Sequence, residues 1–92
     1  MEFEWDPKKA KSNLKKHGIT FDEASSVFDD RLATVYEDPD HSADEKRFLM
    51  IGTSIQNRLL HIAFADQGRR IRMITARKVT KRERKLYEEE SR

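Results

Sequence analysis

The chain has 92 residues, of which 36% are hydrophobic and 39% are charged, and its net charge at pH 7 is +2. A chain of this length forms one domain, so we expect a single domain over residues 1–92. The absence of cysteine excludes disulfides and cysteine-based zinc sites, and no apolar run reaches the ~18 residues of a membrane span, so we expect a cytoplasmic protein that does not enter a membrane.

The charges are distributed unevenly along the chain. Residues 69–92 contain ten Lys or Arg and four Glu, whereas residues 22–45 contain nine acids and a single base, Arg31. Asymmetry of this kind guides the approach of partners rather than specifying a fold. The basic segment therefore predicts contact with a phosphate backbone or an acidic partner, unless it is only a solvated surface.

Two N-terminal elements are expected, a strand over residues 2–5 and a helix over residues 6–18. Asp6 is a good N-cap, and Pro7 occupies the first helical position, where its missing N–H costs no hydrogen bond. Gly18 is the expected C-terminal stop of the helix. The spacing i, i+4, i+7 predicts an apolar face made of Ala10, Leu14 and His17.

A second helix is expected over residues 20–30. Thr20 and Glu23 have the spacing of a capping box, in which each side chain accepts a hydrogen bond from the backbone N–H of the other residue. The apolar stripe of this helix comprises Phe21, Ala24, Val27 and Phe28.

The rest of the chain predicts strands, turns and a last helix. Apolar and alternating segments indicate strands over residues 32–38, 47–54, 58–66 and 69–77, with a polar loop over 39–46. Thr80 and Glu83 form a second capping box, which opens a helix over residues 81–91. The order β-α-α-β-β-β-β-α predicts an α+β fold, in which two N-terminal helices pack on one face of an antiparallel sheet.

The last predicted strand is rich in arginine. Alternation places Arg70 and Arg72 on one face. The other face carries Ile71, Met73 and Thr75. A regular strand would place Arg77 there too, but a bulge or turn at the strand end would redirect it. The planar fork of Arg donates two parallel hydrogen bonds to phosphate, so this strand indicates phosphate binding.

The chain also contains the side chains that RNA cleavage without a metal would need. Such cleavage requires a base for the neighbouring 2′-OH, an acid for the leaving oxygen, and cations around the phosphate. Candidates for proton transfer are Lys16, His17, Glu83 and Tyr87. Glu83 and Tyr87 are four residues apart, so they share one face of the last helix.

The histidines occur in different contexts. His17 ends the first helix on its apolar face, which favours a capping or packing role, although the helix dipole also favours a charged imidazolium. His61 alternates with Leu60 and Ile62, so it lies either on an open sheet face or in a polar corner of the core. His41 falls in an acidic loop exposed to solvent. No spacing of His, Asp and Glu resembles a confident metal site, and we expect neither a metal nor a cofactor.

Three segments together resemble a known family. They are FEWDPKKAKSNLKKHGITFDEASSVFDD, DPDHSADEKRFLMIGTS and RIRMITARKVTKRERKLYEE, and they contain the patterns WDPxKxxxNxxKHGxxFxEA and RxxxARxxxxxExxxYE in that order. From Phe3 to about Glu89, the chain resembles the BrnT toxins of bacterial type II toxin–antitoxin systems. The matched positions include Trp5, Asp6, Asn13, Lys16, His17, Phe21, Glu23, Ala24, Arg72, Arg77, Glu83 and Tyr87.

The resemblance implies a compact RelE-like fold and a ribonuclease that stops translation and growth. It also implies a cognate antitoxin of the BrnA type with a ribbon-helix-helix domain. The two proteins would form a heterotetramer, and the toxin would reach operator DNA only through the antitoxin. We expect catalysis by His17, Arg72, Arg77, Glu83 and Tyr87. We expect RNA binding by Lys16, Arg70, Lys78, Lys81 and Arg84.

A second function is also consistent with the sequence. The basic strand and helix would then dock a nucleic acid or an acidic protein without any chemistry. If the protein is a ribonuclease toxin, the antitoxin would cover this basic surface or dock on the final helix and an exposed sheet edge.

Overall fold

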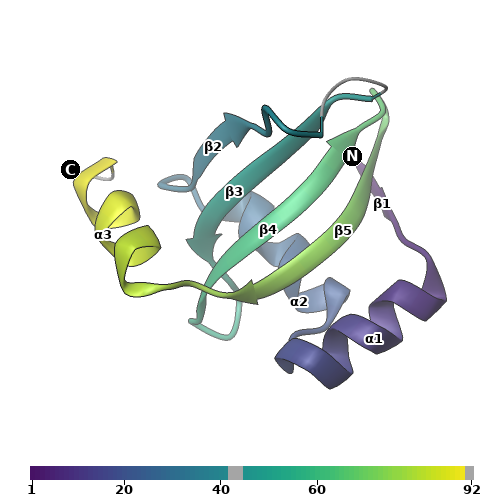
Figure 1. Cartoon of the computed structure of the whole chain (residues 1–92), viewed down its shortest axis with the longest axis horizontal. Coiled ribbons are helices and arrows are strands. Elements are labelled where there is room, and N and C mark those ends of the chain that lie inside the picture. The colour runs from purple at the N-terminus through teal and green to yellow at the C-terminus, as the bar shows by residue number, and fades with distance from the viewer. Residues whose placement is uncertain (42–44, 91–92) are drawn as a thin grey trace.

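The computed structural model describes residues 1–41 and 45–90, and its elements follow the predicted order (Figure 1). The strands are β1 (Glu2–Glu4), β2 (Thr34–Glu37), β3 (Arg47–Thr53), β4 (Leu59–Asp66) and β5 (Arg70–Lys78). The helices are α1 (Pro7–His17), α2 (Phe21–Ser26), the 3-10 helix η1 (Val27–Asp29) and α3 (Lys81–Glu90). Residues 42–44 of the predicted polar loop and residue 91 of the predicted final helix lie outside the described residues.

The five strands form one mixed sheet in the order β1-β5-β4-β3-β2. Strands β2 to β5 pair antiparallel, as predicted, whereas β1 pairs parallel with β5. The sheet is therefore not wholly antiparallel. A parallel pair requires a long crossover connection, and the stretch of chain between β1 and β5 supplies it. Helices α1 and α2 lie behind one face, and α3 lies beyond the strand ends, to the left in Figure 1. We call the sheet face opposite α1 and α2 the open face.

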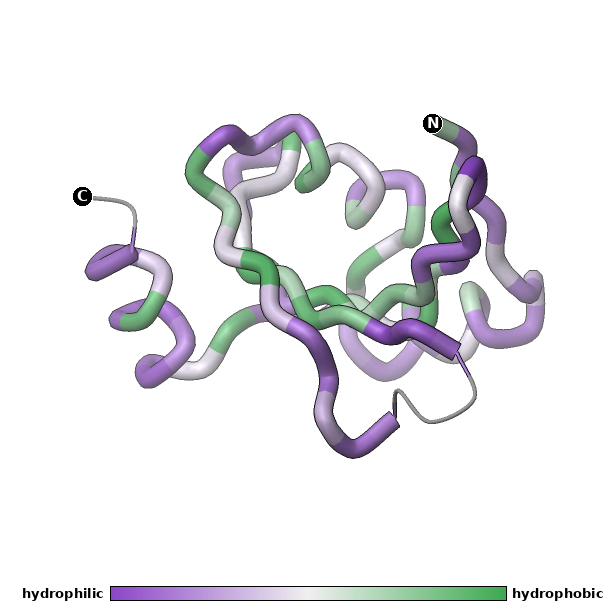
Figure 2. The backbone as a smooth tube through the Cα atoms, turned by 90° about the horizontal axis from the view of Figure 1, so that it is seen from above, coloured by the Kyte–Doolittle hydropathy of each residue, from purple (hydrophilic) through white to green (hydrophobic). Residues whose placement is uncertain are grey.

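The hydrophobic core lies between the sheet and the two N-terminal helices. It consists of Ile19, Phe21, Ala24, Val27, Met50, Leu60, Ile62, Phe64, Ile71, Met73 and Ala76. Helix α3 takes no such part, since none of residues 81–90 is fully buried. Figure 2 shows it as a largely hydrophilic segment that stands apart from the rest of the chain. Hydrogen bonds from Arg77 to Glu83 and from Tyr87 to Asp30 attach α3 to the rest of the chain.

Helix α1 begins and ends as predicted, but its buried side differs from the predicted one. Asp6 accepts a hydrogen bond from the Lys8 N–H (2.9 Å), and Gly18, with φ of 71°, closes the helix on the Leu14 carbonyl (2.8 Å). Leu14 is 47% exposed, so its predicted place on a buried apolar face is wrong. The neighbouring Asn13 is buried instead.

Asn13 attaches α1 to the free edge of β5. Strand β1 pairs with β5 only as far as Arg72, so no strand meets Ala76 on that side. The Asn13 amide accepts a hydrogen bond from the Ala76 N–H (3.0 Å) and donates to the carbonyls of Ala76 (2.8 Å) and Ile19 (3.0 Å). Buried backbone groups require such partners, and this requirement turns Asn13 rather than Leu14 toward the sheet.

Thr20 and Thr80 both serve as N-caps, as predicted, but only the second capping box is complete. The Thr80 hydroxyl accepts a hydrogen bond from the Glu83 N–H (3.2 Å), and the Glu83 carboxylate accepts one from the Thr80 N–H (2.9 Å). Thr20 accepts from the Glu23 N–H (3.0 Å), but the buried Glu23 carboxylate binds the guanidinium of Arg58. The predicted second helix is divided into α2 and η1.

A bulge in β5 interrupts the regular alternation of its side chains. Ala63 of β4 pairs with Thr75, but the next residue of β4, Phe64, pairs with Met73. Strand β5 therefore has one extra residue, Ile74, at this point. A bulge of this kind shifts the faces of all residues that follow it.

The bulge changes which face Thr75 and Arg77 occupy. Thr75 is exposed, so the prediction that it shares a buried face with Met73 is wrong. Ala76, rather than Thr75, enters the core. Arg77 is consequently turned to the open face, which is the outcome expected if a bulge redirects it.

Candidate active site

His61 and Arg77 lie opposite each other on the open face of the sheet. They are cross-strand partners of β4 and β5. Side chains at such positions have Cβ atoms about 4.5–5.5 Å apart, so the imidazole and the guanidinium share one small area. A two-residue connection joins β5 to α3, and the first turn of α3 brings Glu83 to the same place.

Arg77 and Glu83 form a two-pronged ion pair. The Arg77 Nη1 and Nη2 atoms donate to the two Glu83 carboxylate oxygens, each over 2.8 Å, and Nη1 also donates to the Lys78 carbonyl (3.1 Å). The hydrogen bonds from Arg77 hold the pKa of Glu83 at about 2, against an ordinary value of 4.5, and the N–H of Thr80 adds to the effect against the opposing cost of burial. Glu83 is therefore a carboxylate at neutral pH, and it fixes the orientation of Arg77.

His61 is nearly buried beside this pair, at 8% exposure. Its Nε2 lies 3.6 Å from a Glu83 carboxylate oxygen. Burial lowers the pKa of His61 below 6.5, Arg77 lowers it further, and the charge of Glu83 partly opposes both effects. At neutral pH the imidazole is thus uncharged and able to accept a proton, and Glu83 stands ready to stabilise the resulting cation.

Tyr36 of β2 is the further proton carrier on this face. The strand register places Tyr36 in one row across the sheet with Leu49, Ala63 and Thr75. Tyr36 and Thr75 therefore both lie on the open face. Burial raises the pKa of Tyr36 above 10.0, and the charge of Glu83 raises it again while Arg77 opposes this. The phenol therefore stays protonated at neutral pH and is a possible proton donor. Our sequence reasoning did not single out Tyr36, because only the strand register shows that it shares a face with His61.

Two of the predicted catalytic residues have other partners. Arg72 lies on the open face, where its guanidinium forms an ion pair with Glu45. The Tyr87 hydroxyl donates to the Asp30 carboxylate (2.9 Å) and lies 3.4 Å from the Thr53 hydroxyl. Tyr87 thereby anchors α3 to the end of β3 and to η1, and it lies apart from the Arg77–Glu83 pair in its contacts.

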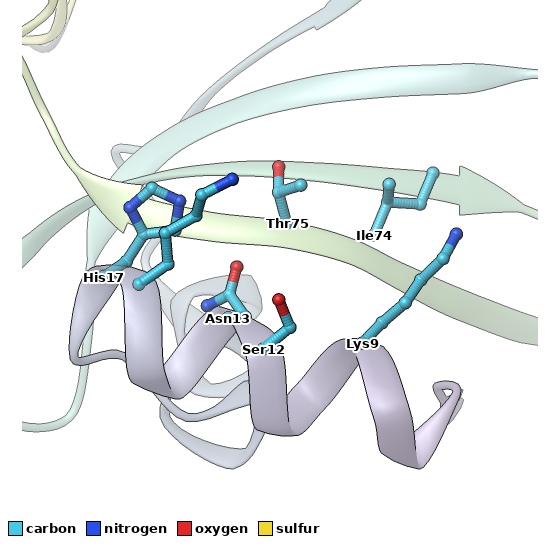
Figure 3. A pocket seen from close by; sticks show the side chains of 7 residues that line it. Lys9, Ser12, Asn13, His17, Ile74 and Thr75 are labelled. Carbon is cyan, nitrogen blue, oxygen red and sulfur yellow. The ribbon is translucent and has the colours of Figure 1, made fainter.

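His17 and Lys16 line a separate cavity between α1 and β5, of about 260 Å³. Its other lining residues are Lys9, Ser12, Asn13, Ile74 and Thr75, and Figure 3 shows side chains of α1 rising toward β5. None of His61, Arg77 and Glu83 lines this cavity. The predicted set of catalytic residues is thus divided between two places, with Arg77 and Glu83 in one and His17 in the other.

The predicted RNA-binding residues are also dispersed. Arg70 is exposed at the end of β5 and pairs with Glu2 (3.3 Å). Lys78 and Arg84 line a second cavity, together with Arg58. Lys81 is exposed in the first turn of α3. Lys78, Lys81 and Arg84 lie at the end of β5 and in α3, whereas Arg70 is the first residue of β5, so these cations do not form one compact site.

Residues 1–41 and 45–90 show no sign of a metal centre or of a membrane-spanning helix. In this part of the chain, no group of three or more His, Asp or Glu side chains is arranged to hold a metal ion. In the same residues, no helix is both long enough and apolar enough to cross a membrane.

Comparisons with known proteins agree with this architecture. The family model described as "Ribonuclease toxin, BrnT, of type II toxin-antitoxin system" matches residues 5–83. Among solved structures, the chain is similar to the ribonuclease toxin BrnT of Brucella abortus, with a TM-score of 0.69 and 24% sequence identity over 88% of this chain and 99% of that chain. Likeness at this identity concerns the fold, which it confirms as the predicted α+β arrangement. No curated protein sequence matches the chain.

Proposed function

Since this chain belongs to the BrnT family of ribonuclease toxins of type II toxin–antitoxin systems, we propose that it cleaves RNA on the open sheet face without a metal ion. Cleavage of messenger RNA would stop translation and growth in the cytoplasm of the producing cell. The proposal treats residues 1–92 as one toxin domain. One observation carries it: an oriented arginine, an ionised carboxylate and an uncharged histidine meet at Arg77, Glu83 and His61.

His61 is the proposed base of the reaction. The imidazole takes the proton of a ribose 2′-OH while the 2′ oxygen bonds to the adjacent phosphorus. The bond from phosphorus to the 5′ oxygen of the next nucleotide breaks, and Tyr36 supplies a proton to that leaving oxygen. The products are a 2′,3′-cyclic phosphate and a 5′-hydroxyl end. The lowered pKa of His61 and the raised pKa of Tyr36 support this division of roles.

Arg77 and Glu83 complete the proposed site through charge. The side chain of Arg77 is 34% exposed, so its guanidinium is accessible to a phosphate while Glu83 holds it in place. It would offset the negative charge that grows on the phosphate oxygens in the transition state. Glu83 would in turn stabilise the imidazolium that forms when His61 accepts its proton.

Other basic residues have a proposed role in holding RNA. Lys78, Lys81 and Arg84 follow Arg77 closely in the chain and would contact the RNA backbone. Arg70 lies at the opposite end of β5, where it would contact a more distant part of the RNA. Arg72 would join them on exchanging Glu45 for a phosphate. The contacts of Tyr87 support a positioning role, through the attachment of α3, rather than proton transfer. A role of His17 in proton transfer would require the RNA to span two places, because it lines the cavity beside α1.

Membership in a type II system implies a cognate antitoxin. We propose that this partner is BrnA-like, with a ribbon-helix-helix domain, and that the two proteins form a heterotetramer. The toxin would then reach operator DNA only through its antitoxin. Mass measurement of the co-expressed complex, followed by operator binding with and without the antitoxin, tests each part.

The decisive experiment compares Arg77→Ala with Arg69→Ala. Arg69 is exposed one residue before β5, so its removal changes the net charge equally. In EDTA, wild-type protein should cleave a labelled RNA, and Arg77→Ala should lower the rate by about 10²–10³-fold, as loss of a transition-state charge partner does. Arg69→Ala should change the rate by less than about threefold, within the range of an ordinary surface substitution.

The same variants distinguish the alternative function. If wild-type protein only shifts the mobility of RNA and leaves it intact in EDTA, the chain is a binding module or needs a metal ion. Repeating the assay with Mg²⁺ separates those two results. A folded Arg77→Ala variant that still inhibits growth fully would exclude Arg77 from the chemistry. Circular dichroism of each variant establishes that it is folded.

A further inference from the structure

Helix α1 carries a group of positively charged side chains. This helix contains Lys8, Lys9, Lys11, Lys15 and Lys16 and no acidic residue. Within residues 1–41 and 45–90, none of these five ammonium groups forms an ion pair, whereas the arginines of the sheet are largely neutralised by acids. Helix α1 is therefore a cationic surface in addition to the basic C-terminal segment that the sequence indicated.

The lysines of α1 fall on two sides of the helix. With 3.6 residues per turn, Lys9 and Lys16 share a side, and both line the cavity beside β5. Lys8, Lys11 and Lys15 share another side, which lies away from that cavity. The chain therefore contains two sets of lysines that differ in position and not in chemistry.

The cavity offers hydrogen-bond donors and no acid. Lys9, Lys16 and His17 supply positive charge or N–H groups, and Ser12 and Thr75 supply hydroxyls (Figure 3). The amide of Asn13 is already committed to the backbone of β5. Lys16 and His17 lie in the last turn of α1, and no carboxylate lines the cavity. Such a lining suits an anion with several acceptor oxygens, and a phosphate is such an anion.

Strand β5 connects the cavity with the candidate active site. Thr75 lines the cavity, and it lies on the same face as Arg77, two residues further along the strand. The edge of β5 is open at this point because β1 ends its pairing at Arg72. A nucleotide chain bound at Arg77 has a direct way across this edge to α1.

We propose that the cavity between α1 and β5 binds a backbone phosphate of the RNA substrate, on one side of the cleavage point. Lys9 and Lys16 are its cationic ligands, with Ser12 and Thr75 as hydroxyl donors. This inference rests on the proposed function, because it extends the RNA path from the same site. The connection through β5 to Arg77 favours RNA over an acidic segment of the antitoxin, which would need no connection to the chemistry.

The test is RNA binding by Lys9→Gln/Lys16→Gln, with Lys8→Gln/Lys15→Gln as the matched control. The ligand is a fluorescent 2′-O-methyl oligonucleotide, which lacks the nucleophilic hydroxyl and so stays intact during the measurement. We expect the Lys9/Lys16 variant to bind at least tenfold more weakly than wild type. Loss of two phosphate contacts should reduce the slope of log K against log salt by about 1.4, at ~0.7 per contact for a single strand. The control should lose less than about threefold.

Each outcome decides between named alternatives. Equal losses in the two variants would mean that α1 attracts RNA only through its net charge, and would overturn the inference. Unchanged RNA binding by the Lys9/Lys16 variant, with weakened antitoxin binding, would assign the cavity to the antitoxin instead. Wild-type cleavage of the corresponding ribose oligonucleotide is measured in parallel. If cleavage occurs while both variants bind alike, this inference alone fails; if wild type neither binds nor cleaves, the proposed function fails with it.

Discussion

The carboxylate of Glu83 lies 3.6 Å from Nε2 of His61, beyond hydrogen-bond reach in the structure. At this distance the negative charge of Glu83 favours protonation of the imidazole. The carboxylate nevertheless forms no hydrogen bond that would keep the ring protonated before the reaction. It also makes the titration of His61 sensitive to the charge of Glu83, which raises the pKa of His61 against the effect of burial.

RNA cleavage should depend on pH through His61. Because the pKa of His61 lies below 6.5, more than half of the imidazole is uncharged at pH 6.5, and the midpoint of the fall in rate should lie at a lower pH. His61→Gln should lower the rate by about 10²–10⁴-fold, the usual contribution of a general base. Single-turnover rates between pH 4.5 and 8 provide the measurement. An acidic limb that persists unchanged in His61→Gln would assign the titration to another group.

Glu83→Gln should shift this acidic limb to lower pH. Removal of the carboxylate charge removes the effect that raises the pKa of His61, while burial and Arg77 continue to lower it. The limiting rate should also fall, since the imidazolium formed in the reaction loses its counter-charge. A shift toward higher pH in the same rate profile would contradict the proposed contact between Glu83 and His61.

Glu83 should also stabilise the fold at neutral pH and lose this contribution in acid. Its pKa is about 2 in the folded protein and 4.5 ordinarily, so below pH 4.5 the unfolded chain takes up a proton that the folded chain does not. The contribution is complete above pH 4.5 and is lost as the pH falls toward about 2. Urea unfolding of wild type and Glu83→Gln at several pH values should therefore give free energies that converge as the pH is lowered. A constant difference between the two proteins would show that the Arg77 pair has no effect on stability.

Asn13→Leu should destabilise the fold. The replacement has a similar size, but it leaves the N–H and carbonyl of Ala76 and the carbonyl of Ile19 without their partner. Each unsatisfied buried group costs about 1–3 kcal/mol, less where water enters from the adjoining cavity. Ser12→Ala, one residue earlier in the same cavity, should change the free energy of unfolding by less than about 0.5 kcal/mol. Equal stability of the two variants in urea would mean that Asn13 does not secure the edge of β5.

Gly52→Ala should be destabilising because β3 approaches η1 closely. A Cβ at this position would lie 2.7 Å from Cγ1 of Val27 and 3.0 Å from the Cβ of Ala33. Overpacking of this kind costs about 1–3 kcal/mol. In the Val27→Ala background the same substitution should cost less free energy of unfolding. In a double-mutant cycle, the double variant should therefore be less destabilised than the sum of the two single variants predicts. Additive effects would show that the two sites do not share this space.

Much of the fold was predictable from local signals. Asp6 and Gly18 mark the ends of α1, and Thr80 and Glu83 mark the start of α3, because capping depends on residues adjacent in the sequence. The antiparallel strands followed from alternation and turns. The parallel pairing of β1 was not predictable in this way, since it joins segments nearly seventy residues apart.

The candidate site was harder to predict than the fold, for a similar reason. A single extra residue in β5, Ile74, decides that Arg77 shares a face with His61, and no local pattern specifies that residue. The place of Tyr36 depends on the register of three further strands. Leu14 was misplaced because amphipathic spacing takes no account of a polar residue such as Asn13 that binds the sheet edge.

The double use of Glu83, as a helix cap and as the partner of Arg77, has a consequence for how the proposed active site forms. Glu83 follows all five strands in chain order, so the sheet contains none of the residues of α3. The first turn of α3 and the orientation of Arg77 arise together, since one side chain makes both sets of contacts. The proposed active site would thus be completed only when α3 folds against the end of β5.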